Sequence, residues 1–179
     1  MTESAETLIL TYILAKDGNR PHLLRQTFAE DAELKMVLNT GAINFPPIAQ
    51  SRESIADILA RQFGATYENI YTFCLDRPPP GDRLASFSCD WAVGMSEKAN
   101  RSVRVGCGRY DWRFSPTAPL RVEHLAITID VMESLPPACG DEILDWLSAL
   151  PYPWCTPKMF VQTAPAIAAL RPVLTRLEP

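Results

Sequence analysis

The stretch Ser102–Phe114 reads SVRVGCGRYDWRF, and its side chains fall into two alternating sets. A period of two is typical of a β-strand, because successive side chains point to opposite faces of the sheet. Neighbouring segments show the same period and are separated by turn sequences rich in proline and glycine. We therefore expect an antiparallel meander whose other strands cover residues 69–75, 84–95 and 121–132.

The residues before position 68 show a helical period instead. Ala5, Leu8 and Tyr12 belong to an apolar stripe with the spacing of an amphipathic helix. We expect, in order, a helix over 5–16, a short helix from Pro21 through Phe28, a strand over 32–38 and a helix from Ser51 to Gly64. Helices followed by a meander indicate an α+β domain in which the helices cover one face of an antiparallel sheet.

The last 44 residues differ from the body of the chain, because they hold eight of the 16 prolines. We expect helices over 141–150 and from about Pro157, with Pro165 bending or ending the second helix. The chain then divides into an α+β domain over residues 1–135 and a helical, proline-rich extension over 136–179. We expect the extension to pack on the domain or on a dimer partner.

Composition excludes several classes of function. The net charge is −4 and no basic cluster occurs, which argues against nucleic acid as a partner. No apolar run reaches the ~18 residues that a membrane span needs, and the acidic N-terminus is unlike a secretory signal, so we expect a cytoplasmic protein without a membrane partner. Five cysteines without a Cys-x-x-Cys pair and two isolated histidines indicate free thiols and no metal site. We expect no cofactor, since no phosphate loop is present.

A resemblance to a known superfamily starts from the sequence FAEDA at Phe28–Ala32, with Tyr12 sixteen residues before Phe28. Together with Arg52, Ile55 and Phe63 in the third expected helix, it resembles the nuclear transport factor two-like (SnoaL-like) superfamily. The resemblance implies a sheet curved into a cone, covered by helices, whose mouth holds a small molecule. It leaves the function open, because this fold hosts isomerases, dehydratases, epoxide hydrolases and pockets without chemistry.

The steroid isomerase branch of that superfamily uses a tyrosine donor, a carboxylate base and a protonated carboxylic acid. The resemblance places the tyrosine at Tyr12, the base at Met36 and the acid at Tyr110. Methionine cannot accept a proton, whereas a phenol can donate a hydrogen bond. This pattern therefore implies two donors and no base.

The epoxide hydrolase branch uses an Arg-x-Asp sequence and a second aspartate. The resemblance places the first aspartate at Asp90, the arginine at Ser88 and the second aspartate near Ile127. Only Asp90 matches, so this triad is also incomplete.

The position of Asp90 is the open question of the second long strand. Alternation buries the face that carries Cys89, Trp91 and Val93, and leaves Asp90 in solvent. The resemblance instead points Asp90 into the cone. The burial of the Cys89 face and an inward-pointing Asp90 can both be true only if a second subunit covers the apolar outer face. We therefore expect a homodimer formed through the outer face of the sheet.

Other residues have two interpretations each. His124 on the last strand titrates near neutrality and is a candidate acid–base group, although a lone histidine of a strand is more often structural or exposed. Gly106 and Gly108 mark either a bend of the sheet or room for a ligand. Trp112 can line a pocket or fill the core. We assign Asp31 a structural role at a helix-to-strand turn, and we treat His22 in the same way.

Three functional hypotheses follow. The first is a pocket that binds a small apolar molecule without chemistry, through Tyr12, Asp90, Tyr110, Trp112 and Phe114. The second is a cofactor-free isomerase, dehydratase or hydrolase in which Asp90 or His124 is the base and Tyr12 or Tyr110 the hydrogen-bond donor. The third is a dimeric interaction module that uses aromatic residues of the extension, namely Trp146, Tyr152 and Trp154.

Overall fold

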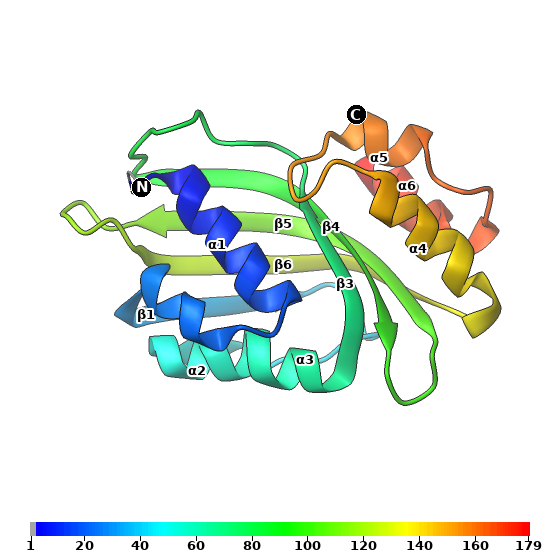
Figure 1. Ribbon diagram of the computed structural model, residues 1–179, viewed down its shortest axis with the longest axis horizontal. Coiled ribbons are helices and arrows are strands. Elements are labelled where there is room, and N and C mark those ends of the chain that lie inside the picture. The colour runs from blue at the N-terminus through cyan, green and yellow to red at the C-terminus, as the bar shows by residue number, and fades with distance from the viewer. Residues whose placement is uncertain (1–2) are drawn as a thin grey trace.

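The computed structural model describes residues 3–179 and contains one curved, open sheet of six strands (Figure 1). The strands follow the order β2-β1-β6-β5-β4-β3. Neighbours are antiparallel except β1 and β6, which are parallel, so the expected antiparallel sheet has one parallel pair. The strands are β1 (Phe28–Leu38), β2 (Ile48–Gln50), β3 (Tyr67–Cys74), β4 (Ser86–Glu97), β5 (Val103–Phe114) and β6 (Val122–Leu135).

Helices from the first third of the chain cover the inner, concave face of the sheet. Helix α1 (Ala5–Asp17) begins at a capping box in which Ser4 and Thr7 exchange hydrogen bonds, and it buries the predicted apolar stripe. The helix expected from Ser51 is one helical segment, and Ser51 caps it. The helical elements here are the 3-10 helix η1 (Pro21–Gln26), α2 (Arg52–Ala56), the π-helical turn η2 (Asp57–Gln62) and α3 (Phe63–Thr66).

The region around the FAEDA sequence folds differently from the expectation. The short helix ends at Gln26, and Phe28 already belongs to β1, where it pairs with Val122 of β6. Pairing with β6 therefore overrides the local helical pattern. Asp31, which we placed at a turn, is an exposed residue of β1, and β2 lies between the expected strand over 32–38 and the helix from Ser51, where we expected no strand.

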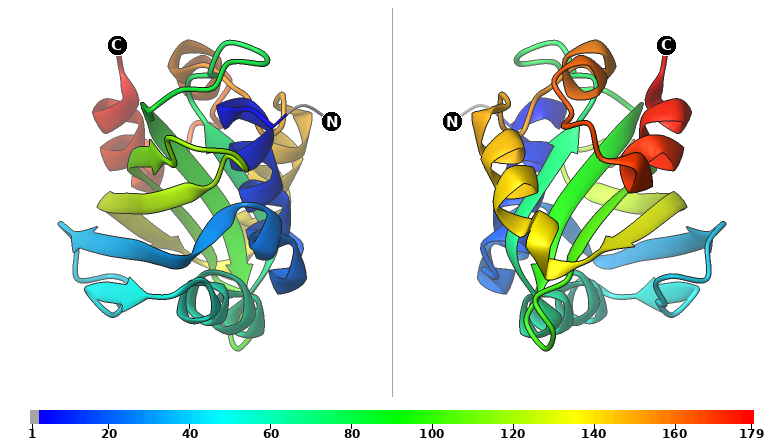
Figure 2. Two further views of the ribbon diagram at one scale, coloured as in Figure 1. Left: turned by 90° about the vertical axis from the view of Figure 1, so that its left-hand side faces the viewer. Right: turned by 90° about the vertical axis from the view of Figure 1, so that its right-hand side faces the viewer.

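Residues 136–179, called the tail below, lie at one end of the sheet (Figures 1 and 2). The helix expected from Pro157 is two helices, because α5 ends before Pro165 and α6 starts after it. The tail consists of η3 (Pro137–Cys139), α4 (Gly140–Ala149), α5 (Pro157–Gln162), η4 (Ala168–Leu170) and α6 (Arg171–Leu177). No helix within residues 3–179 is long and apolar enough to cross a membrane.

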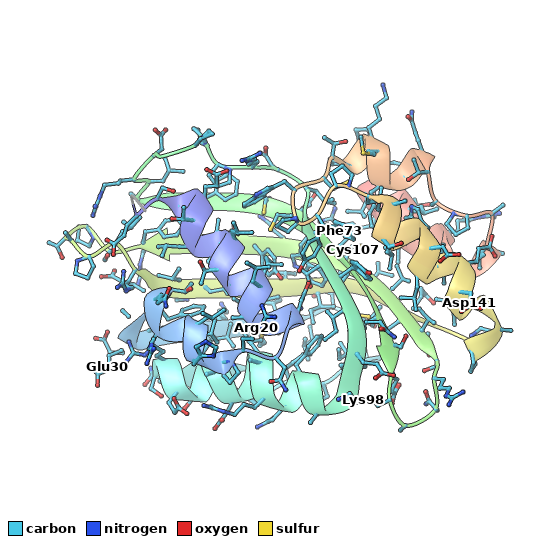
Figure 3. All side chains as sticks on the ribbon, viewed as in Figure 1. Arg20, Glu30, Phe73, Lys98, Cys107 and Asp141 are labelled. Carbon is cyan, nitrogen blue, oxygen red and sulfur yellow. The ribbon has the colours of Figure 1, made fainter. Side chains whose placement is uncertain are left out.

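The tail helices pack on the outer face of the sheet. Their apolar side chains form a core with the outer-face residues Phe73, Val105 and Cys107. Figure 3 labels Phe73 and Cys107 on the part of the sheet beside the tail. Leu147 of α4 lies so close to Gly94 that a Cβ atom there would lie 2.1 Å from its Cδ1 atom. Glycine at this position therefore lets α4 approach the sheet.

Polar contacts fix the tail at both edges of this packing. The Arg176 side chain of α6 donates to the Asp90 carboxylate at 3.2 and 3.3 Å and to Asp130 at 2.8 Å. The Cys74 amide donates to the Pro153 carbonyl at 2.8 Å, and the Cys155 amide donates to the Cys74 carbonyl at 3.1 Å. The tail thus forms one isolated parallel bridge, between Trp154 and Cys74, at the end of the edge strand β3.

The division into a domain over 1–135 and an extension over 136–179 stays a prediction, and we expect the two to unfold as one unit. Leu147→Ala removes a buried side chain between α4 and β4 and should lower the free energy of unfolding by about 2–5 kcal/mol. Urea unfolding measures this change in the free energy of unfolding, and following it by both circular dichroism and tryptophan fluorescence shows whether the two parts unfold together. The exposed Ser148→Ala on the same helix is the control. A separate early transition of the tail would contradict the expectation.

Candidate functional site

A small, partly open cavity lies between the inner face of the sheet and the helices that cover it. Its volume is about 40 Å³, and a single water needs about 10–15 Å³. A larger guest therefore requires side chains to move. Three flexible methionines in the wall lower the free-energy cost of this movement. The apolar wall consists of Met36, Ile43, Phe45, Leu59, Phe63, Val93, Met95, Ile127, Ile129 and Met132.

An open groove adjoins the cavity at two phenylalanines. Ile43, Phe45 and Phe63 line both the cavity and an adjoining open groove. The rings of Phe45 and Phe63 stack with centroids 6.5 Å apart. The loop before β2 is held in place by Arg104, which donates to the Ala42 carbonyl at 2.5 Å. The two rings thus lie where the cavity meets the groove.

Two residues of the cavity wall carry buried hydrogen-bond donors without a partner. The Tyr12 hydroxyl and the Trp91 indole nitrogen are buried, and neither has a hydrogen-bond partner within residues 3–179. Both residues line the cavity, together with Tyr110, whose ring centroid lies 5.9 Å from that of Tyr12. A buried donor left unpaired costs about 1–3 kcal/mol. Neither donor atom is accessible from the cavity, so a guest with an acceptor atom would remove this cost only after side chains of the wall move.

One charged residue also lines the cavity, namely Lys16, which is 7% exposed. Its ammonium group donates to Thr72 Oγ1 at 2.7 Å and to Asp17 Oδ1 at 3.0 Å, and it lies 4.4 Å from the centroid of the Phe63 ring. Lys16 lies one helical turn after Tyr12, so α1 presents both side chains to the cavity.

The Asp17 carboxylate behind Lys16 is fully engaged. It accepts hydrogen bonds from the Thr72 amide at 2.8 Å, from the Thr72 hydroxyl at 2.7 Å and from the Tyr152 hydroxyl at 2.8 Å, in addition to the one from Lys16. This network joins α1, β3 and the tail. It compensates the burial of a charge pair, which is otherwise unfavourable.

Burial controls the protonation of the two cavity tyrosines. Loss of solvation raises the pKa of Tyr12 and of Tyr110 above the ordinary value for a phenol. Both hydroxyls are therefore neutral at physiological pH and can donate a hydrogen bond.

Solved structures with the same arrangement of strands and helices identify the fold. A superfamily protein from Salmonella enterica, described as nuclear transport factor 2-like, matches with a TM-score of 0.57 and 15% identity, over 70% of this chain and 88% of that chain. This chain has the nuclear transport factor 2-like fold. No family model matches the sequence, and no curated protein matches it significantly.

Other solved proteins with this fold differ in their descriptions. A Catenulispora acidiphila protein with a ketosteroid isomerase-like fold, in complex with trimethylamine, matches with a TM-score of 0.52 and 17% identity, over 70% of this chain and 85% of its own. A hexachlorocyclohexane dehydrochlorinase from Novosphingobium barchaimii matches with a TM-score of 0.55 and 10% identity, over 72% and 85%. Identities this low establish the fold alone.

The nuclear transport factor 2-like fold brings part of the expected site together. Tyr12 and Tyr110 both line the cavity, whereas Trp112 packs beside them without lining it, with its ring centroid 5.1 Å from that of Tyr12. Phe114 is buried in the same core but does not line the cavity.

Asp90 and His124 lie outside the cavity, so the structure corrects the expectation that either is its base. Asp90 points to the outer face, where Arg176 binds it. His124 lies at the surface, with its Nε2 atom 3.3 Å from Glu33 Oε1. Alternation along β4 predicts the orientation of Asp90 correctly, because Cys89 and Trp91 point inward. The orientation taken from the superfamily resemblance is wrong.

We expected a homodimer because an apolar outer face of the sheet would need a cover, and the structure provides that cover within the same chain. The tail of the same chain covers the apolar part of that face. The remainder of β5 carries Arg109, Asp111 and Arg113 toward solvent, which is a poor surface for stable subunit contact.

The two glycines of β5 provide close packing and no open space. A Cβ atom at Gly108 would lie 1.8 Å from the Thr128 carbonyl oxygen and 2.9 Å from the Trp91 ring. At Gly106 it would lie 2.5 Å from the Met132 side chain. The glycines therefore allow Trp91 and Met132 to fill the inner face.

The sequence analysis missed Lys16, Asp17 and Thr72. A usable signal was present, because Lys16 continues the apolar stripe of α1 four residues after Tyr12. Within residues 3–179, no group of three or more His, Cys, Asp or Glu could hold a metal ion.

The hydroxyl of Thr72 connects Lys16 with Asp17, so we expect Thr72→Val to lower the free energy of unfolding by about 1–3 kcal/mol. Chemical denaturation measures the change. Thr128→Val is the matched control, because it makes the same change at a half-buried strand residue that does not belong to the network. Equal effects of the two substitutions would contradict a role of Thr72 in the network.

The raised pKa values of Tyr12 and Tyr110 predict a loss of stability in alkaline solution. Above about pH 10 tyrosines ionise in the unfolded chain, while these two keep their protons in the folded protein. The unfolded state then binds fewer protons, so the free energy of unfolding falls as the pH rises. Denaturation at a series of pH values should show a shallower fall for Tyr12→Phe. Tyrosinate absorbance from all five tyrosines of the folded protein near pH 10 would contradict this.

Proposed function

We propose that this protein binds a small, largely apolar molecule that offers a hydrogen-bond acceptor to the cavity. The observation that carries the proposal is the pairing of an apolar wall with buried, unpartnered donors, namely the Tyr12 hydroxyl and the Trp91 indole nitrogen. Pockets for small molecules generally combine an apolar lining with a few polar groups that fix orientation. The fold supports the proposal, because other proteins with it hold small molecules or act on them.

Binding without turnover fits the lining better than acid–base catalysis does. General-base catalysis needs a proton acceptor within hydrogen-bond reach of the substrate. No Asp, Glu or His is among the described residues that line the cavity. Tyr12 and Tyr110 could polarise a carbonyl group, but the bases proposed with them, Asp90 and His124, lie elsewhere. The isomerase, dehydratase or hydrolase hypothesis therefore lacks its proton acceptor.

The interaction-module hypothesis loses the surface that it needs. Trp146 of the tail is buried and donates to Thr163 Oγ1 at 3.0 Å. Trp154 lies under the guanidinium group of Arg77, and Tyr152 is bonded to Asp17. The aromatic residues of the tail thus make contacts within their own chain. Location in the cytoplasm stays a prediction.

Acetophenone and ethylbenzene test the proposal, because they differ by one carbonyl oxygen. We expect acetophenone to bind in the cavity more tightly than ethylbenzene, as measured by NMR titration and by quenching of tryptophan fluorescence. Tyr12→Phe should weaken acetophenone binding about fivefold, the share of one ordinary hydrogen bond, and leave ethylbenzene unaffected.

The same substitution should leave the free protein at least as stable as before, because it removes an unsatisfied polar group. Tyr152→Phe is the matched control, since it removes a hydroxyl that is bonded, and it should lower the free energy of unfolding by about 1 kcal/mol. A loss of stability in Tyr12→Phe, or equal binding of the two probes, would contradict the proposal.

A further inference from the structure

The cavity is too small to hold a ring-sized guest by itself, and a larger open groove adjoins it. The cavity measures about 40 Å³, whereas an apolar cavity that binds benzene measures about 150 Å³. The groove, which shares Ile43, Phe45 and Phe63 with the cavity wall, measures about 290 Å³. A guest with the size of one aromatic ring therefore exceeds the cavity, and the groove is the neighbouring space into which it can extend.

None of the described residues that line this groove is charged. Its polar side chains are those of Asn44, Gln62, Thr66 and Tyr67. The groove beside Tyr152, in contrast, is lined by Asp17 and Arg20. Arg104, which bonds the carbonyl of the groove residue Ala42, is itself paired with Glu97 at 3.1 Å. A charged group in the groove would thus lose water without gaining a free counter-ion.

One polar group of the groove is nearly buried, namely Tyr67 at the start of β3, which is 9% exposed. No hydrogen bond within residues 3–179 engages its hydroxyl group, and burial raises its pKa above the ordinary value of a phenol. The hydroxyl therefore keeps its proton and can donate it. Unlike the Tyr12 hydroxyl, it does not belong to the atoms that are sealed from solvent, so it is open to a hydrogen bond from outside.

The helical side of the groove contains an irregular turn. Ile58 and Gln62 of the π-helical turn η2 line the groove, and Phe63, which begins α3, lines both the groove and the cavity. Single π-helical turns are rare and occur frequently at functional sites. The irregular turn thus lies where the cavity and the groove meet.

We infer that the ligand extends from the cavity into this groove and ends there in an uncharged, hydrogen-bonding group such as an amide, bound by Tyr67 and Gln62. This inference rests on the function proposed above and adds a second subsite to it. An amide oxygen can accept from the Tyr67 hydroxyl, and an amide N–H can donate to the carboxamide oxygen of Gln62. A carboxylate or an ammonium group finds no opposite charge among these partners.

Two derivatives of acetophenone test the inference, because 4-acetylbenzamide and 4-acetylbenzoate match in shape and differ in charge. We expect 4-acetylbenzamide to bind the unmodified protein about fivefold more tightly than acetophenone, the share of one additional hydrogen bond. It should also bind more tightly than 4-acetylbenzoate. Titration calorimetry and NMR measure the three affinities, and this comparison does not depend on how a substitution folds.

Two variants with matched controls assign the effect to the groove. Tyr67→Phe should make the affinities for 4-acetylbenzamide and acetophenone equal, whereas Tyr71→Phe, on the same strand but outside the groove, should change neither. Gln62→Lys places a positive charge in the groove and should tighten binding of 4-acetylbenzoate about threefold, the effect of a screened surface charge. Gln162→Lys, an equally exposed change on the tail, should leave that affinity unchanged. Urea unfolding shows whether each variant retains the fold.

The outcomes separate this inference from the proposed function. If acetophenone binds and 4-acetylbenzamide binds no more tightly, or 4-acetylbenzoate binds more tightly than the amide, the groove inference is overturned and the proposed function stands. Failure of all three compounds to bind would overturn both. An advantage of the amide that survives Tyr67→Phe, or is lost equally in Tyr71→Phe, would overturn the assignment to Tyr67.

Discussion

The structure depends on a sheet that must bury apolar side chains on both faces. Strand β5 contributes Tyr110 and Trp112 to the inner core, while its outer residues Val103, Val105 and Cys107 are equally buried. The helices before β3 cover only the inner face. The tail covers the outer one, where Arg176 binds Asp90, and the cavity lies on the inner side.

Helix α1 links the two sides of this arrangement. Its stripe packs into the inner core, and its last turn places Lys16 at the cavity and Asp17 at a contact with the tail. The position of Lys16 is set by Asp17 and Thr72, and the position of Asp17 is set partly by Tyr152. The tail thus helps to hold Lys16 in place beside the cavity, and none of its described side chains lines the cavity wall.

The sequence predicts what alternation and local signals determine. The strands β3 to β6, the stripe of α1 and the inward face of β4 follow from periodicity alone. The parallel pairing of β1 with β6 does not, because it joins segments about 90 residues apart and has no local signal. The outer residues of β5 did carry a signal for the tail, since Val103, Val105 and Cys107 are followed by Arg109, Asp111 and Arg113 on one face. The distant resemblance, in contrast, implies the wrong orientation for Asp90, which alternation along β4 predicts correctly.

The distribution of unpaired polar atoms argues for a bound molecule more strongly than the cavity volume does. Five buried side-chain nitrogen or oxygen atoms within residues 3–179 lack a partner, and three belong to Tyr12, Trp91 and Trp112. These residues surround Tyr110 in one aromatic cluster. Phenylalanine would fill such positions without the cost of an unpaired donor. A core that concentrates this cost beside a buried lysine is poorly optimised for folding alone, and departures of this kind are expected where a site requires them.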